Sequence, residues 1–177
     1  MAGATKFVLR KGGVVSMSAW VTAGGAGSFT DVGYLDGPIE LGLNWEDAEF
    51  EPEQEDGPIL SEPTSTRGSL KFVMSEQSVP NFLTAFRQPT ANQTGTGDNL
   101  TILVGAGTSG QYHQMKIVGK GPGTTAVRTW TVWKCATESI GGISVSKKEF
   151  GKVEVTMKVL LDPSVTTADK FFKQIDT

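Results

Sequence analysis

The chain has 177 residues, one cysteine, and a formal net charge of −3 at pH 7. This length suits one domain with a real hydrophobic core, and a lone cysteine excludes an intramolecular disulfide. No apolar run approaches the roughly 18 residues of a membrane-spanning helix, and the N-terminus lacks a signal-peptide pattern. We therefore expect a single domain over residues 1–177 that is soluble, made in a reducing cytoplasm and not in contact with a membrane.

The charged residues are unevenly distributed along the chain. No Lys or Arg occurs between Lys11 and Arg67, although that stretch holds eleven acidic residues. From Arg67 onward there are thirteen basic and eight acidic residues. Two interpretations remain open: a solvated acidic loop, or head-to-tail association in which an acidic surface meets a basic one on the next copy.

Alternation of apolar and polar residues predicts strands in the N-terminal half. Short strands are expected at 6–9 and 15–19. The cleanest alternation runs from Ile39 to Trp45, directly after an Asp-Gly-Pro turn signal. A further strand face is predicted at 70–74, where Leu, Phe and Met alternate with other residues.

Residues 46–66 differ from these strands because they contain eight acidic residues and three prolines. Such a composition predicts a long acidic loop, or a hairpin that is mobile in the free subunit. The carboxylates could attract cations without specificity. Their order does not match a calcium-binding EF-hand loop, which needs oxygen ligands at fixed offsets around a glycine.

The best helix is predicted at about residues 79–88. Ser78 can cap it, Pro80 falls in its first turn, and Pro89 stops it. An apolar stripe would lie on one face and cover a sheet. The stripe consists of Val79, Phe82, Leu83 and Phe86.

The C-terminal half predicts a polar loop, several strands and a short closing helix. The loop covers 90–99, and the helix would start at Thr167 and carry Phe171, Phe172 and Ile175. Strands are expected near 100–104, 113–117, 127–135 and 153–161. With roughly eight or nine strands in total, we expect a mainly β fold, an antiparallel sandwich or barrel with one flanking helix.

Residues that suggest chemistry are few. The GxGxxG pattern at 105–110 would bind a dinucleotide only if a helix followed, but the next residues alternate like a strand, which favours a hairpin loop. His113 is the only histidine, and we expect it to pack with Met115 and Ile117. Cys135, on a strand face with Trp133, is expected to be a small core residue. We therefore predict no catalytic residue, cofactor or metal site, and no enzyme activity.

Three segments, in this order, resemble the tail tube (major tail) proteins of long-tailed phages. Residues 32–41 resemble the opening strand of that family, which leads into a long acidic hairpin loop. Residues 67–76 resemble its next strand, which feeds the single helix. Residues 150–164 resemble its closing strand with an Asp-Pro-Ser turn, followed here by the aromatic pair Phe171-Phe172.

The resemblance implies a structural virion protein. Members form hexameric rings whose strands join into one inner β-barrel, and the rings stack into a tube that conducts DNA at ejection. The long loop and the terminal arms, here 46–66 and 162–177, would bridge successive rings. Partners would be other copies of the chain and other tail proteins. DNA would pass a negatively charged lumen without specific binding, and the protein would assemble in the host cytoplasm and reside in the virion tail.

The acidic loop meeting basic residues of the next ring would fix register and polarity. The candidates for this contact are Glu46, Asp47, Glu49, Glu51, Glu53, Glu55 and Asp56 on one side and Lys147, Lys148 and Lys152 on the other.

Two alternatives stay open. A tail terminator or head–tail joining protein would stop at one ring. A β-sandwich module could bind carbohydrate by stacking sugars on Trp20, Trp45, Trp130 or Trp133, although Trp130 and Trp133 fit better as strand packing. A nucleic-acid-binding module would need a concentrated basic patch with interleaved aromatics, which the sequence lacks.

Overall fold

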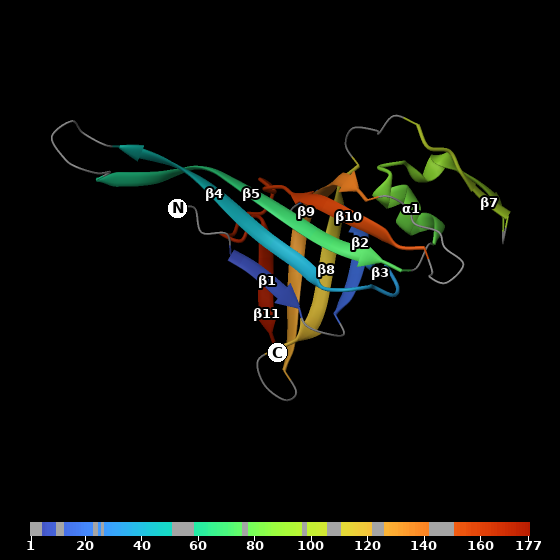
Figure 1. The fold of residues 1–177 in the computed structure, drawn as a ribbon, viewed down its shortest axis with the longest axis horizontal. Helices are drawn as coiled ribbons and strands as arrows, with labels where there is room; N and C mark the ends of the chain where they lie inside the picture. Colours follow the sequence, from blue (N-terminus) through green and yellow to red (C-terminus); the bar gives the residue numbers. More distant parts are fainter. Residues whose placement is uncertain are drawn as a thin grey trace.

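A computed structural model shows a β-rich chain in which one helix and one small hairpin lie at an end of a large curved sheet (Figure 1). The structure describes residues 5–9, 13–22, 25, 27–50, 59–75, 78–96, 99–105, 111–121, 126–141 and 151–177.

The described elements follow one another along the chain in this order: β1 (Thr5–Leu9), β2 (Val14–Ala19), β3 (Thr30–Asp31), β4 (Ile39–Phe50), β5 (Leu60–Met74), α1 (Val79–Ala85), the short 3₁₀ helix η2 (Thr90–Asn92), β6 (Gln93–Thr96), β7 (Asn99–Ile102), β8 (His113–Lys120), β9 (Val127–Ile140), β10 (Val153–Val159) and β11 (Phe172–Asp176).

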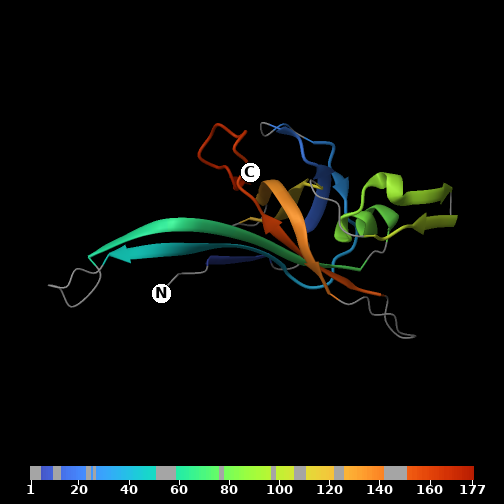
Figure 2. The same cartoon turned by 90° about the horizontal axis from the view of Figure 1, so that it is seen from above.

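Nine of these strands form one antiparallel sheet in the order β1-β4-β5-β10-β9-β8-β2-β3, with β11 paired to β9. The predicted mainly antiparallel β fold with one α-helix is confirmed. The sheet curves so that β4 and β5 pack across β2, β8 and β9 (Figures 1 and 2). The described strands do not close into a barrel, since β1 and β3 remain at the two ends of the strand order.

The core lies on the concave side of this curved sheet. Val155 pairs with Phe72 and Met157 pairs with Leu70 between β10 and β5, and these four side chains are buried. In β10 and in the second half of β5, every second residue reaches the core because side chains alternate across a sheet. Each fully buried aliphatic or aromatic side chain contributes roughly 1.5–3 kcal/mol to folding. The alternation predicted for these strands is therefore what builds the core.

Helix α1 is shorter than the predicted 79–88. It starts after Ser78, as expected, although the Ser78 side chain makes no capping hydrogen bond. The helix ends at Ala85 because Arg87 adopts a left-handed backbone with a φ of 54°. The Gln88 N–H donates to the Leu83 carbonyl (2.7 Å) and the Arg87 N–H donates to the Thr84 carbonyl (3.1 Å). This pattern is the Schellman motif, which terminates a helix before Pro89 can do so.

The helix is fixed to the sheet by polar contacts as well as by its apolar stripe. Asn81 Nδ2 donates to the Val32 carbonyl (2.7 Å), and Thr137 Oγ1 of β9 donates to the Thr84 carbonyl (3.0 Å). The stripe is present in part: Leu83 is buried and the rings of Phe82 and Phe86 stack 6.0 Å apart. Val79 opens the helix.

Of the two forms expected for the acidic segment 46–66, the structure shows the hairpin: residues 46–50 and 60–66 are paired strand and not loop. β4 and β5 pair from Glu40 to Phe50, and the register shifts beside Asp47. The shift leaves an extra residue in β5 next to Pro63, which is tolerated because a proline without an N–H fits a bulge or an edge. Residues 51–58 lie outside the described part of the chain.

Two further expectations are corrected. The polar loop predicted at 90–99 contains η2 and the first strand of the two-stranded sheet β6–β7. Backbone hydrogen bonds across this hairpin stabilise it. Its sequence lacks the alternation of apolar and polar residues from which a strand can be predicted. The GxGxxG segment joins β7 to β8, which belong to different sheets, so it does not close a hairpin between paired strands. Residues 106–110 are not described.

The strand after that segment is confirmed, and Met115 and Ile117 are buried on the predicted apolar face of β8. The predicted face of β9 is wrong in part. The register shifts between His113 and Met115 of β8, so that Cys135 is buried as expected, but Trp130 and Val132 are buried as well, whereas Trp133 of the predicted face is only half-buried. Gln114, expected on the polar face, is fully buried. A β-bulge of this kind changes which face a side chain takes, and strict alternation cannot predict it.

Candidate assembly surfaces

The outer half of the β4–β5 hairpin projects from the sheet. β1 pairs with β4 only as far as Leu43, and β10 pairs with β5 only from Gly68. Residues 44–50 and 60–67, called the ribbon here, therefore form a two-stranded extension with no described strand on either outer edge (Figure 1). Open edges and exposed side chains make the ribbon a natural contact surface for another chain.

The ribbon is acidic. It holds four acidic residues and one basic residue, Arg67. Glu46 Oε1 lies 3.4 Å from Arg67 Nη2, and its other oxygen accepts a hydrogen bond from Ser65 Oγ (2.7 Å). Asp47 and Glu49 are exposed and make no ion pair with any residue that the structure describes. Their charges thus remain available to a partner.

Lys152, predicted to meet the acidic segment, lies at the other end of β5. Val153 pairs with Met74, the last residue of β5, whereas the ribbon contains the first residues of that strand. A strand of this length spans about 50 Å at about 3.3 Å per residue. Within its own chain, Lys152 Nζ lies 2.5 Å from Asp36 Oδ2.

Among the described candidates, Glu46, Asp47 and Glu49 are therefore at the opposite end of the copy from Lys152 and do not meet it. The remaining contact candidates, Glu51, Glu53, Glu55, Asp56, Lys147 and Lys148, lie outside the described residues.

Next to the ribbon, β5 separates from the strands that pair with β9. β10 and β11 pair with successive halves of β9 and run in the same direction, so they behave as one interrupted strand. The Leu160 N–H donates to the Lys134 carbonyl (2.9 Å) and the Trp133 N–H donates to the Phe171 carbonyl (3.3 Å). Residues 161–170 leave and rejoin the sheet between these two bonds. This arrangement corrects the predicted helix from Thr167: pairing with β9 makes the tail a strand.

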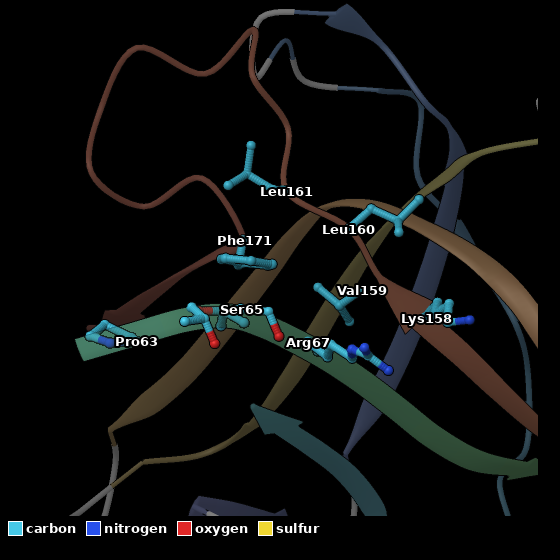
Figure 3. A pocket seen from close by; sticks show the side chains of 11 residues that line it. Pro63, Ser65, Arg67, Lys158, Val159, Leu160, Leu161 and Phe171 are labelled. Carbon is cyan, nitrogen blue, oxygen red and sulfur yellow. The ribbon is translucent and has the colours of Figure 1, made fainter. Parts of the chain in front are cut away.

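A groove opens where β5 diverges from β10 and β11 (Figure 3). Its volume is about 460 Å³, and it is lined by 63–68 of β5, by 158–161 and by Phe171. We call it the fork groove. Gly68 marks its closed end, because β5 passes β10 so tightly there that a Cβ would lie 2.6 Å from Val159 Cβ.

The excursion that forms one wall of the fork groove is held by a buried carboxylate. Asp162 is fully buried and accepts hydrogen bonds from Trp20 Nε1 (2.9 Å), Ser164 N (3.0 Å) and Ser164 Oγ (2.5 Å). Burial alone would raise the pKa of Asp162, but these bonds and the charge of Lys134 outweigh it and lower that pKa. The carboxylate is thus charged at neutral pH.

The cation that faces this carboxylate is itself held by aromatic rings. Lys134 Nζ lies 4.3 Å from the ring centroids of both Trp20 and Tyr112, and those two rings meet edge to face. The arrangement fixes the excursion to β9, since Lys134 belongs to that strand. The sequence showed the Asp-Pro-Ser turn, but nothing in it revealed that the aspartate would be buried against a tryptophan 142 positions away.

Neither of the residues considered for chemistry lines the fork groove or belongs to the ribbon, although Cys135 is the cross-strand partner of Val159. His113 is half-buried, and burial lowers its pKa despite a backbone hydrogen bond with Ser18. Cys135 is buried next to Met157, and burial raises the pKa of its thiol. Among the described residues, no three His, Cys, Asp or Glu side chains gather closely enough to hold a metal ion. No helix in that part of the chain is long and apolar enough to cross a membrane.

Three of the four tryptophans considered for sugar stacking, Trp20, Trp130 and Trp133, donate hydrogen bonds to other residues of the chain. Trp130 is buried and donates from Nε1 to Gln174 Oε1 (3.0 Å), while Trp133 Nε1 donates to the Asp169 carbonyl (2.7 Å). These two hydrogen bonds, and the one from Trp20 to Asp162, tie the C-terminal arm to the rest of the sheet. Trp45 lies on the ribbon and is half-buried.

Comparison with known proteins supports the fold. No family model matches the chain, and no curated protein matches it in sequence. A structural match is found with a chain from the cryo-EM structure of the anti-feeding prophage (AFP) baseplate, 6-fold symmetrised, with a TM-score of 0.51 and 12% sequence identity. The match covers 92% of this chain and 91% of that chain, so the two share a fold over nearly their whole lengths.

Proposed function

We propose that this chain is a structural virion protein that assembles with copies of itself into rings, and that the rings stack into the tube of a phage tail. The observation that carries the proposal is the near-complete fold match to a chain of a prophage baseplate. We infer a tail location and contacts with other tail proteins from the baseplate assembly to which the matched chain belongs, and six subunits per ring from its six-fold symmetry. The chain would act as a scaffold and not as an enzyme.

The open sheet supports ring formation. β1 and β3 end the strand order, and the backbone groups on their outer edges face no described strand. Such edges are normally protected against pairing unless the protein uses them. Pairing between neighbouring copies in a closed ring would leave no edge exposed.

The charge distribution supports stacking. The ribbon at one end of β5 is acidic, whereas at the other end Lys152 is paired with Asp36 of its own chain, so each copy has two unlike ends. Unlike ends associate head to tail, and head-to-tail contacts can repeat without limit along an axis. Electrostatic complementarity would set the polarity and register of the stack.

The proposal is tested by negative-stain electron microscopy and sedimentation of the purified protein at increasing concentration. Long hollow filaments are expected. A protein that sediments as an ordered monomer even at millimolar concentration would overturn the proposal, because its edges would then need no partner.

A second candidate is a ring protein that does not extend into a tube, such as a component at the tail end, a tail terminator or a head–tail joining protein. The observation that favours it is that the matched chain comes from a baseplate. The same microscopy separates the two candidates, since a protein of this kind gives single rings or short stacks and no long filaments.

A further inference from the structure

The far end of the ribbon carries an apolar cluster. Phe50, Ile59 and Leu60 are 58%, 63% and 51% exposed. Phe50 and Leu60 are cross-strand partners, and the Ile59 N–H donates to the Phe50 carbonyl (3.0 Å). These three residues, called the knob here, are therefore held in place by the ribbon backbone. Contiguous exposed apolar side chains on a projecting element are typical of a contact surface.

The fork groove offers an apolar receptor for such a cluster. Val159, Leu161 and Phe171 contribute to its lining, and Leu161 is 48% exposed. Figure 3 shows Phe171 and Val159 beside the strand that carries Ser65 and Arg67. The wall that bears Leu161 is held by the Asp162 hydrogen bonds. A preformed groove binds without first losing conformational entropy.

The knob of a copy cannot reach its own groove. Leu60 precedes Pro63, the nearest lining residue, by three positions and Gly68 by eight on one continuous strand. At about 3.3 Å per residue, the extended strand carries the knob about 10 Å beyond the near end of the groove and about 26 Å from its closed end, so it cannot fold back into it. The groove is thus available only to another chain, and each copy offers one knob and one groove.

Charge favours the same pairing. Asp47 and Glu49 adjoin the knob, while Arg67 and Lys158 line the groove. Both cations already form exposed ion pairs within the chain, with Glu46 and Glu138, so they would add to the attraction at modest strength.

We propose that the knob of one copy seats in the fork groove of the next copy. The contact is heterologous, because the two surfaces differ, and it would therefore link copies in one direction. This inference rests on the proposed self-assembly and names the apolar contact that would help to carry it.

The direct test is cross-linking between two different variants. Phe50→Cys and Leu161→Cys proteins are mixed, allowed to assemble, and treated with an oxidant or a short bismaleimide. Cys135 is fully buried and gives little background. A cross-linked dimer is expected in the mixture and in neither variant alone. Leu103→Cys, which alters a side chain 57% exposed outside both surfaces, is the matched control when mixed with Leu161→Cys.

A second measurement uses assembly itself. Replacing Phe50 and Leu60 by Ser should leave the fold intact, because both side chains are exposed. The concentration needed for assembly should rise about tenfold or more, since two large apolar side chains would no longer be buried at the contact. Leu103→Ser should leave that concentration unchanged.

The outcomes separate this inference from the proposed function. Normal tubes that give no cross-link and show no shift with the double Ser variant would overturn the knob-and-groove contact and leave tube formation standing. A cross-link in Phe50→Cys alone would also overturn it, because the knob would then meet another knob. Wild-type protein that never assembles would overturn the proposed function, and this inference with it.

Discussion

Gly68 of β5 and Val159 of β10 are cross-strand partners at the closed end of the fork groove, and a Cβ on Gly68 would lie only 2.6 Å from Val159 Cβ. The same Cβ would lie 3.1 Å from Leu43 Cδ2, which is the flexible end of a side chain, so the contact with Val159 Cβ is the decisive one. Gly68→Ala should therefore destabilise the fold by roughly 1–3 kcal/mol, as overpacking of a core does. Chemical denaturation measures the loss. The paired variant Gly68→Ala with Val159→Gly, compared with Val159→Gly alone, tests the cause, because removing the Val159 Cβ removes the contacting atom and should reduce the additional penalty.

Arg87 should be replaceable by glycine with a gain in stability. Its φ of 54° is costly for a residue with a Cβ, and its Nε is buried without a hydrogen bond to any described residue. Arg87→Gly should stabilise the chain by about 0.5–1 kcal/mol, or a few degrees in Tm. Arg87→Ala is the control: it removes the buried Nε but keeps the Cβ. If both variants gain equally, the backbone is not the source of the strain.

The buried Asp162 should make stability sensitive to acid. Its pKa in the folded chain lies below its usual 3.8, so the carboxylate stabilises the fold above that pH and stops doing so as the pH falls through the folded pKa. Asp162→Asn should lower the free energy of unfolding by about 1–3 kcal/mol at neutral pH, because the charge-assisted hydrogen bonds from Trp20 and Ser164 are weakened.

The difference in unfolding free energy between wild type and Asp162→Asn should therefore shrink below about pH 4. Asp169 and Asp176 also have lowered pKa values and contribute to acid unfolding in both proteins, so the comparison isolates Asp162. A difference that stays constant from pH 7 to about pH 2 would contradict the assignment.

Cys135 should be unreactive in the folded protein. It is fully buried, and burial raises the pKa of its thiol, which leaves almost no nucleophilic thiolate. Labelling with a chromogenic disulfide reagent at about pH 8 should be slow without denaturant and rapid when the chain unfolds. Fast labelling under native conditions would place the thiol near the surface and would remove the basis for the clean cross-linking background.

Reversing charge on the ribbon should weaken head-to-tail association. Asp47→Lys with Glu49→Lys should raise the concentration needed for tube formation several-fold, with partial recovery at high salt, because screening weakens repulsion between like charges. The neutral pair Asp47→Asn with Glu49→Gln serves as the control and should have a smaller effect. Tubes that form normally from the reversed variant would show that ribbon charge does not direct the stack.

Local sequence patterns predicted several elements well. Ile39, Leu41, Leu70 and Phe72 are buried as the alternation indicated, and Ser78 marks the start of α1 as expected. These predictions succeed because side-chain alternation and helix-start preferences depend on neighbours within a few positions. The acidic segment was harder to assign, since prolines and carboxylates are typical of loops although part of this segment forms the strands of the ribbon.

What the sequence alone determined is the class of fold: many short strands, one helix and an acidic segment set against a basic remainder. Only the tertiary structure decided where those charges lie, which face of β9 is buried, and that the tail becomes β11 beside β9 and not a helix. Pairing partners, bulges and the burial of Asp162 against Trp20 depend on residues far apart in the chain. Backbone hydrogen bonds with a distant strand can outweigh a local helical preference, and no short window of sequence contains both partners.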